Sequence, residues 1–146
     1  MTIPRGTKHP TDPERTDAPV LFVVDDDPSI RTLIGDLARD LGWDVLGFAR
    51  LREFRERLSG EARPTLMILD DALPDGSGGD LARRLRSDPR TKDVPLLVCT
   101  AAHPVRQAEI GRWASVVAKP FTLHEIERVL DAAAFPRFDR LHPPAG

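Results

Sequence analysis

The chain has 146 residues, of which 21 are Lys or Arg and 23 are Asp or Glu, giving a formal net charge of −2. A length of about 150 residues favours one domain, and a near-neutral charge argues against a dedicated nucleic-acid binder, which needs a basic excess to displace counterions. The single cysteine, Cys99, excludes a disulfide framework and a zinc cluster, and without a membrane-length apolar run or a secretory signal we expect a cytoplasmic protein with no membrane partner.

The first part of the chain begins with a polar, proline-rich segment and then alternates apolar runs with helical patterns. Residues 1–19 hold four prolines among polar and charged residues, so we expect a flexible tail. A strand is predicted at Val20–Val24, and an edge strand at Trp43–Phe48 because a charged residue interrupts its apolar run. Apolar residues at helical spacing between these strands predict a helix that Asp27 caps and Gly42 ends.

The rest of the chain repeats this alternation of strand and helix. The segment Pro104–Gly111 is only weakly periodic, so its helix is expected to be short. Thr122 and Glu125 have the spacing of a capping box at the start of the last helix. We expect the domain to cover residues 20–134, and residues 135–146 to form a second flexible tail. Further strands are predicted at Thr65–Leu69, Leu96–Cys99 and Ser115–Ala118, and further helices around Leu51–Leu58, Leu81–Leu85, Pro104–Gly111 and Leu123–Ala133.

Five strands that are each followed by a helix predict an α/β fold with a doubly wound parallel sheet between two layers of helices. In such sheets, ligands bind beyond the carboxyl ends of the strands, at the point where the strand order reverses. The residues directly after each predicted strand are therefore the candidate functional residues.

Charged or hydroxyl side chains follow four of the five predicted strands. Carboxylates that converge repel one another unless a cation lies between them, and oxygen ligands without His or Cys suit Mg²⁺. Taken singly, each position has a simpler interpretation: a solvated turn, a polar loop, a hydroxyl that bonds nearby backbone, or an exposed lysine before a proline. Their joint placement favours a Mg²⁺ site with a lysine partner. The residues are Asp25, Asp26, Asp27, Asp70, Asp71, Thr100 and Lys119.

Four motifs stand at these strand ends in a fixed order. They are Val-Val-Asp-Asp-Asp-Pro (23–28), Leu-Asp-Asp-Ala-Leu-Pro-Asp-Gly (69–76), Cys-Thr-Ala (99–101) and Ala-Lys-Pro-Phe (118–121). Together they resemble the receiver domain of two-component response regulators, in its single-domain, chemotaxis-type form. The resemblance covers about residues 19–134 and implies a flavodoxin-like sheet of strand order 2-1-3-4-5. It further implies Mg²⁺ as cofactor, and a histidine kinase or histidine phosphotransfer protein as the phosphoryl donor.

The resemblance also implies a role for each site residue. Asp70 matches the phosphoacceptor because it lies four residues before Pro74, a register that Asp71 does not meet. A carboxylate is a usable nucleophile toward phosphorus, and phosphoryl transfer needs positioning and charge neutralisation more than covalent help. By the same match, Asp25, Asp26, Asp70 and the main-chain carbonyl of Ala72 are the Mg²⁺ ligands, and Thr100 and Lys119 contact the phosphoryl oxygens.

Three features depart from the family pattern. Val116 stands where the family usually has an aromatic residue whose rotamer change accompanies the movement of the threonine, and a valine cannot swing a ring. The segment that carries the fourth helix is shorter than usual and contains Pro104. Ala72 and Ala102 occupy positions where longer side chains often tune dephosphorylation in the family.

Three functional hypotheses remain open. The first is a stand-alone signalling receiver, because only 12 residues follow Ala134; it would act by protein contact or onward phosphotransfer, alone or as a homodimer, and would be no enzyme beyond self-phosphorylation and autodephosphorylation. The second is a pseudo-receiver that binds partners without phosphorylation, as Val116 suggests. The third is a Mg²⁺-dependent phosphohydrolase of the haloacid-dehalogenase type, disfavoured because the acidic pair Asp70–Asp71 precedes Lys119. The sequence specifies neither the kinase nor the downstream protein.

Overall fold

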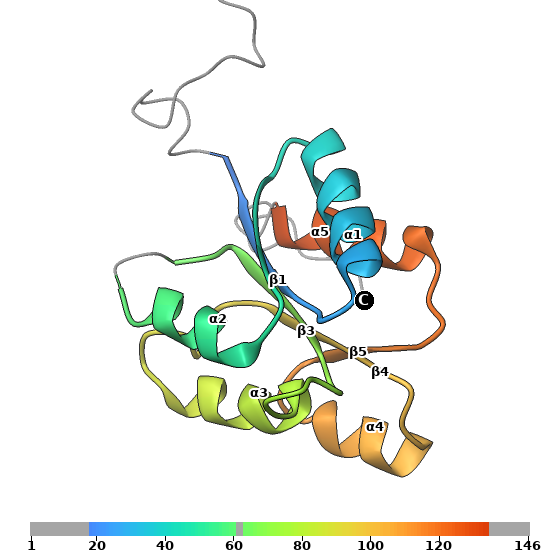
Figure 1. Ribbon diagram of the computed structural model, residues 1–146. Coiled ribbons are helices and arrows are strands. Elements are labelled where there is room, and N and C mark those ends of the chain that lie inside the picture. Colours follow the sequence, from blue (N-terminus) through green and yellow to red (C-terminus); the bar gives the residue numbers. More distant parts are fainter. Residues whose placement is uncertain (1–17, 61–62, 135–146) are drawn as a thin grey trace, which may run out of the picture.

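The computed structural model describes residues 18–60 and 63–134, which form five strands and five helices in alternation (Figure 1). The strands make one parallel sheet in the order β2-β1-β3-β4-β5, so the predicted fold class and strand order are confirmed. The two predicted tails, 1–19 and 135–146, lie outside the described residues except for residues 18 and 19. The strands are β1 Val20–Val24, β2 Asp44–Phe48, β3 Leu66–Asp70, β4 Leu96–Thr100 and β5 Ser115–Ala118; the helices are α1 Pro28–Asp40, α2 Leu51–Leu58, α3 Gly78–Ser87, α4 Pro104–Ile110 and α5 Leu123–Ala134.

Helices cover both faces of the sheet, α1 and α5 on one side and α2, α3 and α4 on the other (Figure 1). Because successive strand residues point to opposite faces, Leu21 and Val23 join the core beneath α1 and α5, whereas Phe22 and Val24 join the core beneath α2 to α4. Burial on both faces explains why the central strands are continuous apolar runs. Strand β2 lies at an edge of the sheet, as predicted, and it is only half-buried. No helix within 18–60 or 63–134 combines the length and the hydropathy needed to cross a membrane.

The strand boundaries differ slightly from the prediction at the edge where the site lies. The predicted strand 65–69 is shifted by one residue, to Leu66–Asp70, and the Thr65 hydroxyl before it accepts a hydrogen bond from the first N–H of β1 at 2.9 Å. Asp70 is a strand residue that pairs with Cys99, and Thr100 likewise ends β4 inside the ladder. Two predicted site residues are therefore held by strand pairing rather than by loops.

The predicted helix signals are confirmed. The Asp27 carboxylate accepts a hydrogen bond from the first turn of α1 at 2.8 Å, and Gly42 follows that helix with a φ of +95°. Thr122 and Glu125 form the capping box of α5: the Thr122 N–H donates to Glu125 Oε1 at 2.9 Å and the Glu125 N–H donates to Thr122 Oγ1 at 3.2 Å. The short α4 has 7 residues and buries only Ile110 among its side chains.

The helix α2 is capped from outside its own segment. Its N-cap residue, Arg50, makes no side-chain capping bond. Instead, the N–H groups of Leu51 and Arg52 donate to the two carboxylate oxygens of Asp75 at 3.0 and 2.9 Å. Asp75 lies in the loop between β3 and α3, so this loop is tied to α2 as well as to the strand that it leaves.

Candidate functional site

Three carboxylates from neighbouring strands meet at the carboxyl edge of the sheet. Asp25 directly follows β1 and is 3% exposed, and Asp70 ends β3 and is 5% exposed, whereas Asp26 is exposed to solvent. One carboxylate oxygen from each of the three lies within 4.8 Å of the other two. The convergence of acids from the first and third strands is thus observed as predicted.

Lys119, at the end of β5, faces the same carboxylates. Its Nζ lies 3.1 Å from Asp70 Oδ1 and 3.6 Å from Asp25 Oδ2. Its backbone N–H donates to the carbonyl of Thr100 at 2.8 Å, which holds it beside β4, and a cis peptide bond joins it to Pro120. The ammonium group therefore bridges acids that come from two different strands.

The cluster carries more negative than positive charge, because it holds three carboxylates and one ammonium group, which pairs with Asp25 and Asp70. Burial raises the pKa of Asp25, and repulsion from Asp70 adds to this effect. Burial alone would lower the pKa of Lys119, but its hydrogen bond to Asp70 and its attraction to Asp25 prevail and raise the pKa. Carboxylates held this close together repel one another, and one ammonium group does not balance their charge. Binding of a further cation would therefore stabilise the cluster.

The donor atoms of this cluster fit Mg²⁺. All three side chains offer carboxylate oxygens, which is the ligand type that Mg²⁺ prefers. The neighbouring thiol of Cys99 does not compete, because burial raises its pKa to about 12 and keeps it neutral. Ala72 lies beside the cluster, where its N–H donates to Asp70 Oδ1 at 3.3 Å.

Asp71, the residue next to Asp70, belongs to a separate network. Its Oδ1 accepts hydrogen bonds from Ser77 Oγ at 2.6 Å, from the Gly79 N–H at 3.1 Å and from Arg106 Nη2 at 3.2 Å. Its Oδ2 accepts one from Thr100 Oγ1 at 2.9 Å. Burial alone would raise the pKa of Asp71, but these donors outweigh it and lower the pKa. Asp71 was a candidate for the predicted acidic site by its position after the third strand, and this network was not predicted.

Thr100 is therefore engaged away from the acidic cluster. The side chain is buried, and its hydroxyl donates to Asp71 while it accepts the Ala102 N–H at 3.0 Å. Val116, the position expected to be aromatic, is a half-buried residue of β5 that packs on the core beneath α2 to α4. The structure brings Thr100 to the correct strand end, with Asp71 rather than Asp70 as its partner.

Two consecutive glycines allow α3 to start against the site. A Cβ on Gly78 would overlap the main-chain oxygen of Asp70 and lie 2.9 Å from Leu69 Cβ. A Cβ on Gly79 would lie 2.8 Å from Asp71 Oδ1 and 2.9 Å from Arg106 Nη2. The sequence signal that could have predicted this close approach is the glycine pair at the beginning of a helix.

A family model described as the response regulator receiver domain matches residues 21–131. The chain belongs to this family. Receiver domains are signalling modules that bind Mg²⁺ at an acidic site and interact with histidine kinases and downstream targets. The membership leaves the phosphohydrolase hypothesis without support, and the acidic cluster at the sheet edge is the part of this receiver that corresponds to a Mg²⁺ site.

Relatives of this receiver include both single-domain and longer proteins. It is 31% identical over 115 residues to the chemotaxis protein CheY1 of Helicobacter pylori, a match that covers 76% of this chain and 93% of CheY1. It is 30% identical to the phosphate regulon transcriptional regulatory protein PhoB of Pseudomonas aeruginosa, covering 77% of this chain but only 50% of PhoB. The match thus spans nearly all of a chemotaxis relative and about half of a transcriptional regulator.

Solved structures have the same fold. The chemotaxis response regulator CheY4 of Vibrio cholerae superposes with a TM-score of 0.71 at 24% identity, covering 80% of this chain and 98% of CheY4. The receiver domain of the sensor histidine kinase PA1611 of Pseudomonas aeruginosa superposes with a TM-score of 0.67 at 25% identity, covering 80% of this chain and 98% of that domain. The latter structure contains a magnesium ion coordinated in its active-site cleft.

Proposed function

We propose that this receiver is a phosphoacceptor in a two-component phosphorelay, and that Asp70 takes the phosphoryl group. The observation that carries the proposal is the contrast between the two adjacent acids. Asp70 is buried against Asp25, Asp26 and the Lys119 ammonium group, whereas both oxygens of Asp71 are already occupied by donors. Asp70 is therefore the carboxylate that is left to act as a nucleophile.

In the proposed step, an Asp70 oxygen attacks the phosphorus atom of a phosphohistidine on a histidine kinase or histidine phosphotransfer protein. The new O–P bond forms as the P–N bond breaks, and the histidine nitrogen keeps the electron pair. The incoming phosphoryl group is anionic, and so is the carboxylate that attacks it. Lys119 lies close enough to Asp70 to offset part of this repulsion.

The remaining charge is offset by Mg²⁺, which when bound supplies positive charge to the phosphoryl oxygens. Asp25, Asp26, Asp70 and the main-chain carbonyl of Ala72 would hold this ion. Thr100 has a single hydroxyl proton, and it is donated to Asp71 in this structure. To contact a phosphoryl group on Asp70, Thr100 would have to give up Asp71, because one proton cannot serve both acceptors.

The product is an acyl phosphate that water can later hydrolyse. Apart from transfer to and from partner proteins, self-phosphorylation from small donors and autodephosphorylation are the only activities that we propose for this chain. We propose that residues 20–134 act as the receiver domain in the cytoplasm. Its output would be a contact with a downstream protein or onward phosphotransfer, by the monomer or by a homodimer.

The proposal is tested by measuring the intact mass of the protein after incubation with acetyl phosphate and Mg²⁺. We expect the mass of one phosphoryl group to be gained by the wild type and by Asp71→Asn, and no gain for Asp70→Asn. A wild type that gains no mass with any donor would instead support the pseudo-receiver, which keeps the fold without phosphorylation. A gain that persists in Asp70→Asn would place the acceptor elsewhere.

A further inference from the structure

The network around Asp71 joins the site to the helix α4. Three of the four hydrogen bonds to this carboxylate fall on Oδ1, and they come from the start of α3 and from Arg106 of α4. Among residues 18–60 and 63–134, Oδ2 has one donor, the Thr100 hydroxyl. Arg106 also donates to Ser77 Oγ at 3.0 Å and to Asp80 Oδ1 at 3.1 Å.

Arg106 is an important anchor of α4. This helix buries a single side chain, Ile110, so little apolar packing holds it on the domain. The Nη2 atom of Arg106 lies within hydrogen-bond distance of acceptors from the loop after β3, namely Asp71 and Ser77, and from Asp80 of α3. Any change in the orientation of the Asp71 carboxylate therefore changes the attachment of the first turn of α4.

We infer that Asp71 is a positioning residue that holds the Thr100 hydroxyl in the resting protein and links it, through Arg106, to α4. This inference rests on the proposed function. A phosphoryl group on Asp70 offers charged acceptors at the same strand edge, and it would draw the Thr100 proton from Asp71. Oδ2 of Asp71 then loses its donor while the side chain remains mostly buried, with 12% of it exposed. A buried acceptor that loses its partner is costly, so the carboxylate and the guanidinium paired with it rearrange.

The hydrogen bonds from Thr100 through Asp71 to Arg106 provide a connection to α4 that Val116 cannot provide. A valine has no ring whose rotation could follow the movement of Thr100, and Val116 is packed into the core beneath α2 to α4. The chain Thr100–Asp71–Arg106 connects the end of β4 to α4 by two hydrogen bonds of 2.9 and 3.2 Å. The information that Asp70 is loaded can thus reach the surface of α4 through polar contacts alone.

The first test is a double-mutant cycle on the affinity for beryllofluoride, a phosphoryl mimic, measured by calorimetry with saturating Mg²⁺. Asp71→Ala should bind beryllofluoride about tenfold more tightly than the wild type, because Thr100 is no longer held elsewhere. In a Thr100→Val background, the same change should have less than about a threefold effect, since the residue through which Asp71 acts is gone. Asp75→Asn, which removes a charge from the same loop without contact to Thr100, is the matched control and should change affinity little.

The outcomes separate the inference from the function on which it rests. If Asp71→Ala has the same effect with and without the Thr100 hydroxyl, or if Asp75→Asn matches it, Asp71 acts by charge alone and the inference is wrong. If the wild type and all variants fail to bind beryllofluoride and to gain phosphoryl mass, the proposed function itself fails, and the inference fails with it.

The second test measures amide hydrogen exchange in α4. Loading the wild type with beryllofluoride should speed exchange of the 105–110 amides, and unloaded Asp71→Ala should already exchange at about that faster rate. Exchange in α5 serves as the internal control and should not change. Equal α4 exchange in unloaded wild type and unloaded Asp71→Ala would refute the link to α4.

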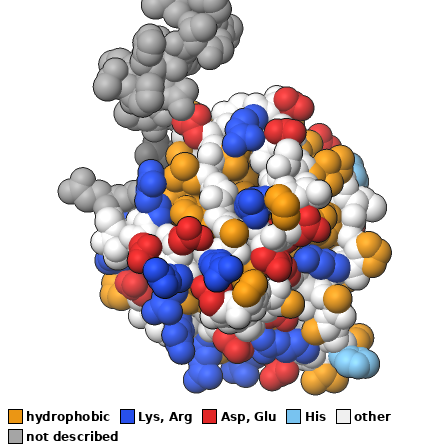
Figure 2. Space-filling model, in the orientation of Figure 1, with side chains coloured by type: hydrophobic (Ala, Val, Ile, Leu, Met, Phe, Trp, Pro, Cys, Tyr) orange, Lys and Arg blue, Asp and Glu red, His pale blue; other side chains and the backbone are white. Residues whose placement is uncertain are grey.

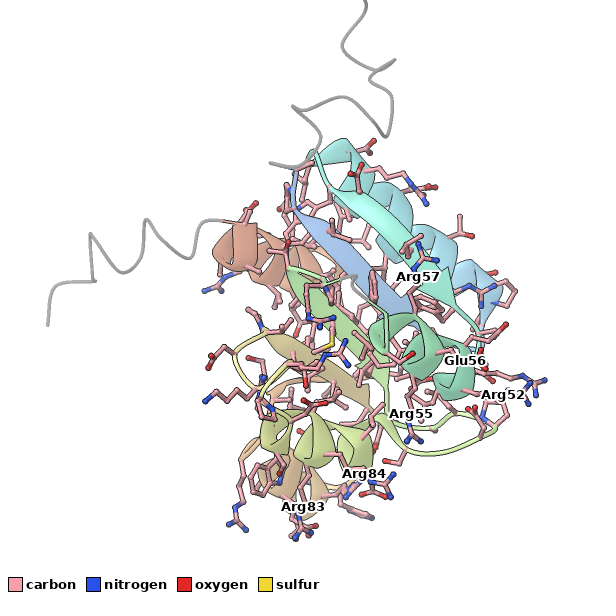
Figure 3. All side chains as sticks on the ribbon, turned by 90° about the vertical axis from the view of Figure 1, so that its left-hand side faces the viewer. Arg52, Arg55, Glu56, Arg57, Arg83 and Arg84 are labelled. Carbon is pink, nitrogen blue, oxygen red and sulfur yellow. The ribbon has the colours of Figure 1, made fainter. Side chains whose placement is uncertain are left out.

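A second inference comes from the surface of α2 and α3, where arginines gather (Figures 2 and 3). Arg52 and Arg55 project from α2, and Arg83 and Arg84 project from α3; we call these four residues the arginine row. Figure 3 shows Arg55, Arg84 and Arg83 following one another across the two helices. A groove of about 770 Å³ runs between α2 and α3, with Arg52, Arg55 and Arg84 along its sides.

The acids beside this groove are already engaged. Asp75 accepts the first N–H groups of α2, Asp80 pairs with Arg106 at 3.1 Å, and Glu56 lies 4.0 Å from Arg52. Within the described part of the chain, the guanidinium groups of Arg55, Arg83 and Arg84 form no hydrogen bond or ion pair. Three of the four arginines in the row therefore present a positive charge that no acid of the described residues pairs with, on a protein whose net charge is −2.

We propose that the arginine row binds an acidic polypeptide segment of a partner protein. Arginine forks suit carboxylates, and Leu51 and Leu81 line the groove between the charged walls. The row holds four arginines on two helices, which is shorter than the continuous basic track that a polyphosphate backbone needs. An acidic protein segment with an apolar residue between its carboxylates fits both the charges and the floor of the groove.

The test uses a fluorescein-labelled poly-L-glutamate peptide as the probe, with anisotropy measured at two salt concentrations. The double variant Arg55→Gln/Arg84→Gln should bind it at least about tenfold more weakly than the wild type. The control is Arg39→Gln/Arg128→Gln, which removes equal charge from α1 and α5 on the opposite layer and should bind like the wild type. Equal weakening by the control, no binding by the wild type, or tighter binding of single-stranded DNA of equal charge would each overturn this proposal.

Discussion

Asp70 and Asp71 are neighbours in sequence, yet they lie in two regions with opposite electrostatic balance. The region of Asp70 concentrates three carboxylates against one ammonium group, and burial raises the pKa of Asp25 within it. The region of Asp71 surrounds one carboxylate with four donors, which lower its pKa. The first region is poised to take up positive charge and a phosphoryl group, whereas the second is complete and holds the fold together. The comparison indicates that the functional acids are those whose negative charge is not balanced by neighbouring donors and cations.

The largest expected effect is on the rate of phosphorylation, when the cation of the Asp70 region is removed. Lys119→Ala should slow phosphorylation by acetyl phosphate about 100-fold, because the charge that offsets the attack on phosphorus is lost. Arg106→Gln removes a cation from the Asp71 region and is the matched control. We expect it to change the rate by less than about tenfold. Intact-mass time courses measure both, and equal loss in the two variants would contradict the contrast between the regions.

The next effect concerns metal and stability. With Mg²⁺ at about 100 times its dissociation constant, the wild type should gain about 2.7 kcal/mol in the free energy of unfolding. Asp25→Asn should lose most of that gain, and Asp71→Asn should keep it.

Without metal at pH 7, Asp25→Asn should be more stable than the wild type, because the raised pKa of Asp25 means that the fold disfavours its charged form. Urea unfolding with and without a chelator measures each case, and a destabilised, metal-free Asp25→Asn would contradict this prediction.

A smaller effect comes from the Asp71 region itself. Asp71→Asn should lower the free energy of unfolding by about 1–3 kcal/mol at pH 7, because buried donors lose a charged acceptor. The lowered pKa of Asp71 means that its contribution is complete above its ordinary pKa of 3.8 and is lost as the pH falls below that value. The difference between wild type and variant should therefore shrink in acid. A difference that grows as the pH falls would show that the sign is wrong.

The smallest effect is expected at Arg106. Its side chain is 32% exposed, so its ion pairs with Asp71 and Asp80 are partly screened by solvent. Arg106→Gln should cost about 1 kcal/mol or less in the free energy of unfolding, and less in high salt. A cost that is unchanged by salt would assign its role to packing instead.

The parts of the site that sequence could predict are those fixed by strand ends. Asp25, Asp70 and Lys119 each follow an apolar run, and the parallel arrangement of the strands brings those ends to one edge whatever the side-chain geometry. The capping box of α5 was predictable for a similar reason, since both of its residues lie within one helical turn.

The parts that sequence could not predict depend on side chains from distant segments. Arg106 reaches Asp71 from 35 residues away, and Thr100 reaches it from 29 residues away. No periodicity or local motif encodes which acceptor a hydroxyl or a guanidinium selects among several at one edge. The family motif predicts that Thr100 contacts the phosphoryl group once Asp70 is phosphorylated. In this structure its partner is Asp71, and that choice depends on the three-dimensional arrangement of the site.

The hydrogen bonds from the start of α2 to Asp75 constrain the length of the loop between β3 and α3. The same few residues leave Asp70, reach across to the start of a different helix and return to begin α3 at Gly78. An insertion or deletion of one residue in this loop would shift Asp75 away from the α2 N–H groups even if every site residue were retained. If this loop is grafted onto another receiver, the first N–H groups of the recipient's second helix must therefore lie within hydrogen-bond distance of the Asp75 carboxylate.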